Sequence, residues 1–411
     1  MDFKIQQKRI YPTILVFLLL VLFRVDSKIF FVLSIALFMY MLKKNRFKLR
    51  YPVRLGVVFY TVFAVLCFAI GMSRYEMRDC IRDLFYILPT ILWIFIGCNL
   101  EFDVDRSLLK TLYVYSVIVS LNAWIMFLLN PAFDFQYLRN IFGEQVYSVG
   151  FIMPVMLVQV LILKETVFTK RVDKFVLVLM ISQCILSFGR MSILQPLIEL
   201  FVLCYLLMKI NKSATLLSRI FVIIGSLGLV VTIALCFTPD GLINEFMDKF
   251  SRIFEEINSS QSYNSYGNAI SNWRGYEIYA AKELWESGNL FEQLFGFGLG
   301  KGVKINYIPS EFTFVTDSEI PLLHNGFFTI LIKCGAIGLL SFLFVYILSI
   351  RKGIMLIHGQ SDEEIFDGLI LTSVVFVSIF LTYVVRGPVQ QGVFIIWALL
   401  IGYIPAYHKN I

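Results

Sequence analysis

The sequence has little charge and almost no histidine. Only 16% of its 411 residues are Asp, Glu, Lys or Arg, and three are histidine, while 58% are hydrophobic. Soluble domains carry about 25% charged residues, so this chain lacks the polar side chains that would cover a water-exposed surface. The composition therefore excludes a soluble globular protein and predicts a membrane protein.

The sequence also lacks the usual patterns of metal, disulfide and nucleotide sites. Its seven cysteines stand singly, without a Cys-x-x-Cys pair or a Cys/His spacing. The one Asp-x-Asp pattern, Asp103 and Asp105, falls in a connection predicted to lie inside the cell, so we expect no metal and no cofactor. GFGLGKG (296–302) has no Ser or Thr after its lysine and follows no predicted strand. We expect a tight turn there that exposes its backbone, open to an anionic ligand, and no nucleotide site.

Long apolar runs take up most of the chain. A helix needs about 20 residues to cross a bilayer core, and a run such as GAIGLLSFLFVYIL (335–348) is apolar on every side, whereas a barrel strand alternates with a period of two. The sequence predicts an all-α polytopic membrane protein with about twelve transmembrane helices. These are residues 10–23, 29–42, 55–71, 85–98, 107–129, 148–163, 175–187, 191–208, 220–238, 326–349, 367–384 and 392–405.

Basic residues predict how the chain is oriented. Lys and Arg gather in alternate connections, among them KKNRFKLR (43–50) and KETVFTKRVDK (164–174). Because cytoplasmic loops are rich in Lys and Arg, both termini are predicted to be cytoplasmic. The net charge of +7 follows from this bias, so it indicates no nucleic-acid partner.

One connection is much longer than the others. It divides the chain into residues 1–238 with spans one to nine, an outer segment at 239–325, and residues 326–411 with the last three spans. The outer segment holds two predicted amphipathic helices, LINEFMDKFSRIFEEI and SNWRGYEIYAAKELWES, the second capped by Ser271 or Asn272. Long loops in compact proteins usually carry function, so we expect the site here.

Cationic side chains gather at the predicted outer face. His324 in PLLHNGFF (321–328) opens the tenth span, and Arg190 in SFGRMS (187–192) opens the eighth. Arginine binds phosphate through two parallel hydrogen bonds and keeps its proton, which favours a pyrophosphate site. The alternatives are salt bridges at helix ends for the arginines and a helix cap for His324. The further arginines at this face include Arg252, Arg274 and Arg386.

These elements occur in a familiar order. SFGRMS before an apolar helix, Arg274 on an outer segment that ends in GFGLG, and HNGFF followed by Gly335 and Gly338 together resemble the O-antigen polymerase and O-antigen ligase superfamily. The resemblance covers residues 187–345. Phe188 and Gly189 stand here in place of the usual small residue between Ser and Arg. It implies a GT-C-type, metal-independent glycosyltransferase of the bacterial inner membrane that acts on undecaprenyl-pyrophosphate-linked glycans.

The resemblance also implies roles for particular residues. Arg190 and Arg274 would stabilise the leaving pyrophosphate and His324 would be the base, since an imidazole titrates near neutral pH. Aromatic rings on the outer segment can stack on sugars or lie at the lipid headgroups, and both roles stay open. The residues expected to bind substrate are Arg190, Arg274, Arg386, Arg252, Tyr263, Tyr266, Trp273 and Asn325.

The most specific function implied is a polymerase that joins lipid-linked repeat units at the outer face, with a flippase and a chain-length regulator as possible partners. A ligase that moves finished polysaccharide onto lipid A-core would use the same donor chemistry. A flippase for lipid-linked oligosaccharides is a more distant alternative, because transporters usually contain internal repeats and none is visible.

Two charges fall inside predicted spans. Glu199 follows Arg190 by nine residues and Lys333 follows His324 by nine, so straight helices would place both at the same depth. Such charges usually face a partner or a wet cavity. The sequence therefore suggests either a Glu199–Lys333 pair or separate polar contacts for each.

Overall fold

The computed structural model describes residues 9–48, 56–100, 107–210, 215, 218–219, 222, 225, 228, 263, 265–307, 319–389 and 394–408. The elements are α1 (Pro12–Leu22), α2 (Ser27–Lys44), α3 (Gly56–Met72), α4 (Met77–Cys98), α5 (Leu108–Leu129), α6 (Phe135–Phe142), α7 (Val146–Leu157) with a π-helical turn (Val158–Ile162), α8 (Lys170–Leu186), α9 (Arg190–Ile210), α12 (Tyr266–Ser271), α13 (Trp273–Ser287), α14 (Leu290–Phe295), α15 (Gly326–Ile357), α16 (Asp362–Val385) and α17 (Ile395–Tyr407), with strands β1 (Val303–Lys304) and β2 (Glu319–Ile320).

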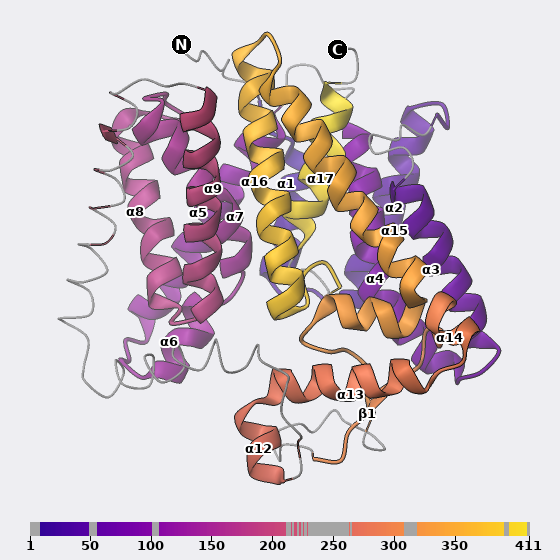
Figure 1. Ribbon diagram of the computed structural model, residues 1–411. Helices are drawn as coiled ribbons and strands as arrows, with labels where there is room; N and C mark the ends of the chain where they lie inside the picture. The colour runs from indigo at the N-terminus through magenta and orange to yellow at the C-terminus, as the bar shows by residue number, and fades with distance from the viewer. Residues whose placement is uncertain are drawn as a thin grey trace.

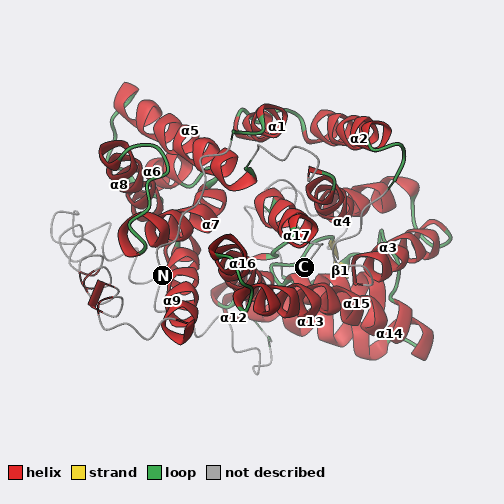
Figure 2. Cartoon of the chain, turned by 90° about the horizontal axis from the view of Figure 1, so that it is seen from above, coloured by secondary structure: helices red, strands yellow, loops and turns green. Residues whose placement is uncertain are grey.

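The long helices form one bundle, and the short ones lie at its lower end (Figure 1). Helices α5–α9 stand on the left of this view and α2, α3, α4 and α15 on the right. Helix α16 packs against both α15 and α9 and so links the two sides, while α17 packs on α4. Figure 2 shows α17 near the middle of the bundle, between α4 and α7.

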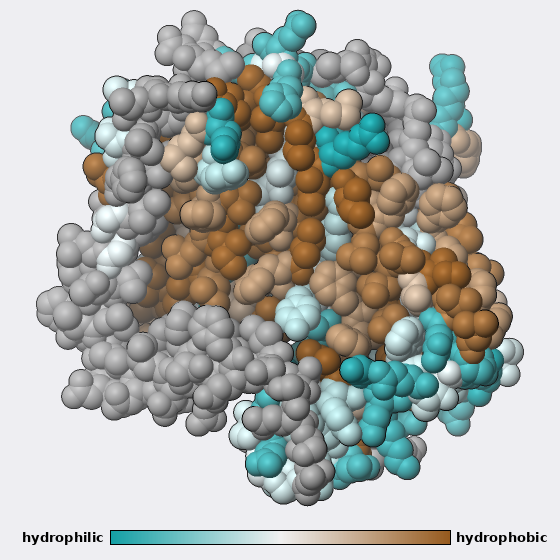
Figure 3. Space-filling view, in the orientation of Figure 1, coloured by the Kyte–Doolittle hydropathy of each residue, from teal (hydrophilic) through white to brown (hydrophobic). Residues whose placement is uncertain are grey.

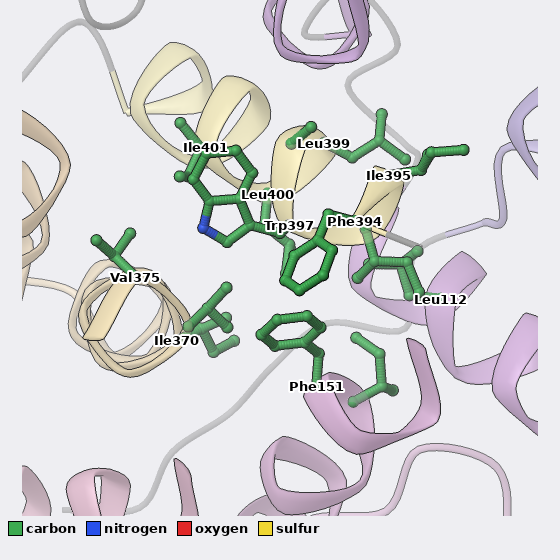
Figure 4. Close-up of a cluster of buried hydrophobic side chains, with 14 of the residues drawn as sticks. Leu112, Phe151, Ile370, Val375, Phe394, Ile395, Trp397, Leu399, Leu400 and Ile401 are labelled. Carbon is green, nitrogen blue, oxygen red and sulfur yellow. The ribbon is translucent and has the colours of Figure 1, made fainter. Parts of the chain in front are cut away.

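The apolar core lies around α17. Trp397 is fully buried, and Phe394 at the start of the helix meets Phe151 of α7 edge to face, with ring centroids 5.8 Å apart. Figure 4 shows these side chains with Ile370 and Val375 of α16 on one side. The last helix is therefore a central packing element of the bundle.

The structure confirms an all-α membrane protein. Apolar side chains cover the exposed helices of the bundle and hydrophilic ones gather over the short helices below (Figure 3). Five described helices are long and apolar enough to cross a membrane, or six if the bent pair α6–α7 forms one span. All predicted spans except 220–238 coincide with helices, and that span lies mostly outside the described residues. The count of twelve stays a prediction.

The two ends of the described chain lie at the same end of the bundle. The rings of Tyr11, before α1, and Tyr403, in the last turns of α17, are 6.3 Å apart. Helices α12–α14 lie at the opposite end (Figure 1). The cytoplasmic assignment of the termini stays a prediction.

The short helices have an apolar cluster of their own. Asn272 caps α13 by accepting from the backbone N–H of Gly275 (3.1 Å), and Asn289 caps α14 together with Glu292. Strands β1 and β2 pair antiparallel with Val303 opposite Ile320. The members of the cluster are Tyr263, Ala269, Tyr276, Ala280, Ala281, Phe297, Val303, Ile305, Ile320, Leu323 and Ile332.

Helix α15 is broken at Gly335, whose φ of 68° is left-handed. Its first part lies across the lower end of the bundle above α13, and the rest runs upward (Figure 1). Backbone carbonyls freed by the break need other donors. The glycine-rich loop supplies two, because Phe297 N–H donates to Ile332 O (2.9 Å) and Gly298 N–H to Lys333 O (3.1 Å).

Three further N–H groups of this loop are also used inside the protein. Gly296 donates to Glu292 O, Leu299 to Cys67 O, and Gly300 to Asp83 Oδ2 (2.7 Å). The glycines at 296, 298 and 300 all have positive φ, a conformation open to glycine at no steric cost. Five of the seven N–H groups in GFGLGKG therefore have partners inside the protein and are not open to an anionic ligand.

The suggested Glu199–Lys333 pair is also wrong. The Lys333 ammonium pairs with Asp83 of α4 and donates to Lys301 O (2.9 Å), while both carboxyl oxygens of Glu199 are buried without a hydrogen-bond partner among the described residues. The depth argument assumed a straight tenth span. Because α15 turns at Gly335, Lys333 stays at the lower end, near the glycine-rich loop.

We expect Lys333→Met to destabilise the protein strongly. The substitution leaves the Asp83 carboxylate, which is fully buried, without its ammonium partner. Breaking a buried pair in this way costs about 3–5 kcal/mol. Thermal unfolding in detergent measures the loss, with Lys282→Met as control because its pair with Glu286 is exposed. Equal unfolding temperatures for the two variants would contradict the role given to the buried pair.

Candidate functional site

His324 is held by a buried carboxylate on another helix. Its Nδ1 lies 2.9 Å from Oε1 of Glu277 on α13, and its backbone N–H donates to Oε2 of the same side chain (2.6 Å). Glu277 is 2% exposed, while the imidazole keeps 26% of its surface exposed. Because a carboxylate only accepts, the proton of the neutral ring belongs on Nδ1. Nε2, which has no partner among the described residues, is then free to accept a proton from a substrate.

The two residues after His324 fix the chain around it. Asn325 caps α15 by accepting from the N–H of Phe328 (3.2 Å), and its buried Nδ2 has no partner among the described residues. At Gly326 a Cβ would collide with the carbonyl oxygen of Arg386. Asn325 is thus a helix cap with one amide donor left for a ligand, and Gly326 lets the segment after α16 come close.

Arg386 lies beside the Glu277–His324 pair. Its backbone N–H donates to His324 O (2.6 Å), and its φ of 78° ends α16 in a left-handed turn. Its Nε is buried and has no hydrogen-bond partner among the described residues. Burial lowers the pKa of Arg386 from its usual value and the charge of Glu277 opposes this, so the guanidinium stays protonated.

Arg190 and Arg274 come together at Tyr147. Arg190 is the first residue of α9 and Arg274 the second of α13, and both side chains are half-buried. Their charges, with that of Arg139 on α6, all act on the hydroxyl of Tyr147 at the start of α7. The carbonyl of Tyr147 accepts from Gln195 Nε2 (2.9 Å), which ties α7 to α9. One phenol therefore lies within electrostatic range of three arginines from three helices.

The turn before α9 accounts for the spacing in SFGRMS. Phe188 has a positive φ of 46°, and its ring packs on Phe135 of α6 with centroids 5.7 Å apart. At Gly189 a Cβ would lie 2.6 Å from the hydroxyl oxygen of Ser192. Phe188 thus packs this turn against α6, the helix that carries Arg139.

Helix α13 joins the two halves of the site. Arg274 and Glu277 are three residues apart, so their side chains share one face of the helix. The charge of Arg274 acts on Tyr147, and the carboxylate of Glu277 contacts His324. Of the residues that the sequence singled out, His324 and Arg386 are thus joined by a backbone hydrogen bond, and Arg190 and Arg274 both lie within electrostatic range of Tyr147.

The aromatic residues of the outer segment differ in how accessible they are. Tyr263 is only 7% exposed, and its ring packs on Tyr276 (5.2 Å between centroids). Trp273 is partly buried against the same cluster, whereas Tyr266 is 50% exposed beside Tyr307. Of these three candidates for sugar stacking, Tyr266 offers the most open ring. Arg252 lies outside the described residues.

Three residues of this site were not found from the sequence. Glu277 and Tyr147 lie in apolar or amphipathic segments, and Arg139 lies in the short helix QYLRNIF between predicted spans. The one signal for Glu277 was its spacing of three residues from Arg274. Within the described ranges, no group of three or more His, Cys, Asp or Glu side chains could hold a metal ion.

Part of the chain is similar to a known protein family. Residues 175–343 match a family model described as O-antigen ligase, and no curated protein matches the chain. The matched range contains Arg190, Arg274, Glu277 and His324, while Arg139, Tyr147 and Arg386 lie outside it.

The contact with Glu277 predicts which nitrogen of His324 carries the proton. We expect ¹⁵N NMR of the neutral ring to show the Nδ1–H tautomer. His408 is an internal control, because its Nε2 faces Asp367 Oδ2 (2.7 Å) and its proton is expected on Nε2. Glu277→Gln should change only the His324 signal, since the ring and the backbone N–H contact different oxygens of Glu277 and one of these becomes an NH2 donor in glutamine. An Nε2–H tautomer at His324 in the unsubstituted protein would contradict the assignment.

Proposed function

We propose that this chain polymerises lipid-linked repeat units into a surface polysaccharide. The match of residues 175–343 to a family model described as O-antigen ligase supports the O-antigen polymerase and ligase superfamily. The donor is the growing glycan on undecaprenyl pyrophosphate, and the acceptor is a sugar hydroxyl of the next lipid-linked unit. Transfer takes place at the outer face of the bacterial inner membrane, in a GT-C-type enzyme that needs no metal or cofactor.

The contact between His324 and Glu277 is the observation that carries this proposal. It orients the imidazole and leaves Nε2 to take the proton of the acceptor hydroxyl. The hydroxyl oxygen then forms a bond to the anomeric carbon of the donor glycan. The bond from that carbon to the pyrophosphate breaks, and its electron pair leaves with undecaprenyl pyrophosphate. Glu277 stabilises the imidazolium formed and is thus a positioning residue.

The arginines supply the positive charge that the leaving pyrophosphate needs. Arg190 and Arg274 lie around Tyr147, and Arg386 lies next to Glu277. Guanidinium groups fixed before the reaction stabilise developing negative charge without having to reorganise. In this proposal Arg139 adds a fourth charge, while Asn325 Nδ2 and Tyr266 are available to contact the glycan.

A ligase is the second candidate, because the matching family model is described as O-antigen ligase. The donor chemistry is the same in both enzymes, and only the acceptor differs: lipid A-core for a ligase, a second lipid-linked unit for a polymerase. The geometry of the base and the arginines serves both reactions.

The lipid-linked glycan of cells that lack the protein distinguishes these functions. We expect single repeat units on undecaprenyl pyrophosphate at the outer face of the membrane. Long chains on undecaprenyl pyrophosphate with bare lipid A-core would instead identify a ligase. Single units confined to the inner face would identify a flippase.

Restoring the gene with His324→Ala tests the base. We expect a folded protein that still binds the lipid-linked donor but transfers it roughly 10²–10⁴-fold more slowly, as expected for loss of a general base. Polymer length on gels and single-turnover rates with purified protein give the two readouts. His358→Ala, at the opposite end of α15, is the matched control. Full activity of His324→Ala would overturn the role of His324, and high activity of His324→Gln would favour a hydrogen-bonding role for it.

A further inference from the structure

An apolar groove lies between α1, α2 and α4 at the same end of the bundle as the site. Its volume is about 190 Å³. Phe30, Ser34 and Trp93, all buried, form its floor, and Ser27 and Gln145 lie at its lower end. Ser27 and Ser34 are seven residues apart on α2, so the groove extends about 10 Å along the helix axis.

The floor of the groove is aromatic. Phe30 stacks on Trp93 with ring planes 7° apart and centroids 5.8 Å apart, and Phe31 of the same helix meets Phe85 edge to face (5.0 Å). Both pairs lie within the set of residues that lines the groove. Such a surface suits a hydrocarbon chain with branched methyl groups, because burying apolar area is its main favourable interaction.

The lower end of the groove adjoins the arginine cluster. Gln145 lines the groove and Tyr147, two residues later, is the phenol that Arg190 and Arg274 act on. An ion pair between Arg24 and Glu144 (2.6 Å) fastens the α1–α2 turn to the residue before Gln145. The lower end of the groove is therefore two residues along the chain from Tyr147, on which the arginines act.

Helix α4, which forms one wall of the groove, also contacts the segment that carries Arg386. Tyr86, next to the groove residue Phe85, lies within the electrostatic range of Arg386. Four residues further along α4, the Thr90 hydroxyl donates to Pro388 O (2.6 Å), which ties α4 to the segment that carries Arg386. The helix that forms this wall of the groove is thus tied to the segment that carries Arg386.

We propose that this groove binds the first isoprene units of the donor's polyprenyl chain. The assignment rests on the proposed function, which places the pyrophosphate among the arginines. A chain attached to that pyrophosphate has to enter the apolar part of the bundle beside Tyr147, and the groove extends upward from there. The rest of the chain lies in the bilayer.

Filling the groove tests the assignment. Ser34 is 1% exposed at its floor, so Ser34→Phe should occupy the space of the chain. We expect the KM for an undecaprenyl-linked donor to rise by about tenfold or more, with little change in kcat. A donor whose pyrophosphate carries a short, water-soluble alkyl group in place of the isoprene units should be used equally well by both proteins. Val32→Phe is the control, because Val32 is 63% exposed on the outer side of the same helix.

A second experiment uses the unsubstituted protein and does not depend on transfer. A polyprenyl phosphate with a photoreactive group on its first isoprene units should crosslink to residues 27–34 or 85–93, and excess undecaprenyl phosphate should suppress this. Crosslinks at other segments only, or competition by phospholipid alone, would overturn the proposal. An equal rise in KM for both donors would also overturn it. Crosslinking at the groove in a protein without transfer activity would instead refute the proposed function and leave the groove assigned.

Discussion

The need to pair every backbone N–H and C=O away from water shapes this molecule more than any other constraint. It makes each membrane-crossing segment a helix, and it allows a helix to break only where another part of the chain supplies hydrogen bonds. Helix α15 breaks at Gly335, and the N–H groups of Phe297 and Gly298 bind the freed carbonyls. The break turns the first part of α15 across the lower end of the bundle, which is how His324 comes to lie against α13.

The spans could be predicted from the sequence because burial of apolar side chains is a local property of a run of residues. The break could not, although Gly335 and Gly338 were visible as glycines. A glycine permits a left-handed φ without requiring it, and what requires it here is a loop about forty residues earlier in the chain. The same loop explains why Lys333 binds Asp83 instead of Glu199. Straight helices were the wrong assumption, and the pairing of charges failed with it.

The candidate site shows the same division between local and long-range information. Arg190, Arg274 and His324 stand in short patterns at helix ends, so a reading of the sequence finds them. Glu277 is a glutamate among many on an amphipathic helix, and only its contact with His324 gives it a role. Tyr147 and Arg139 likewise gain theirs from where α6 and α7 lie relative to α9 and α13. No local pattern contains that arrangement.

In the proposed reaction, helix α13 carries both the residue that orients the base and one of the arginines that stabilise the leaving group. Glu277 orients His324 and Arg274 belongs to the arginine cluster, one turn of helix apart. Each residue of an α-helix is turned by about 100° from the one before, so a shift of register by a single residue would remove both side chains from their places. Tyr276 and Ala280 of α13 belong to the apolar cluster of the short helices, and their packing there opposes that rotation. In the proposed reaction, the packing of this small cluster thus holds the proton acceptor and the arginine charge at a fixed separation, as a displacement at one carbon atom requires.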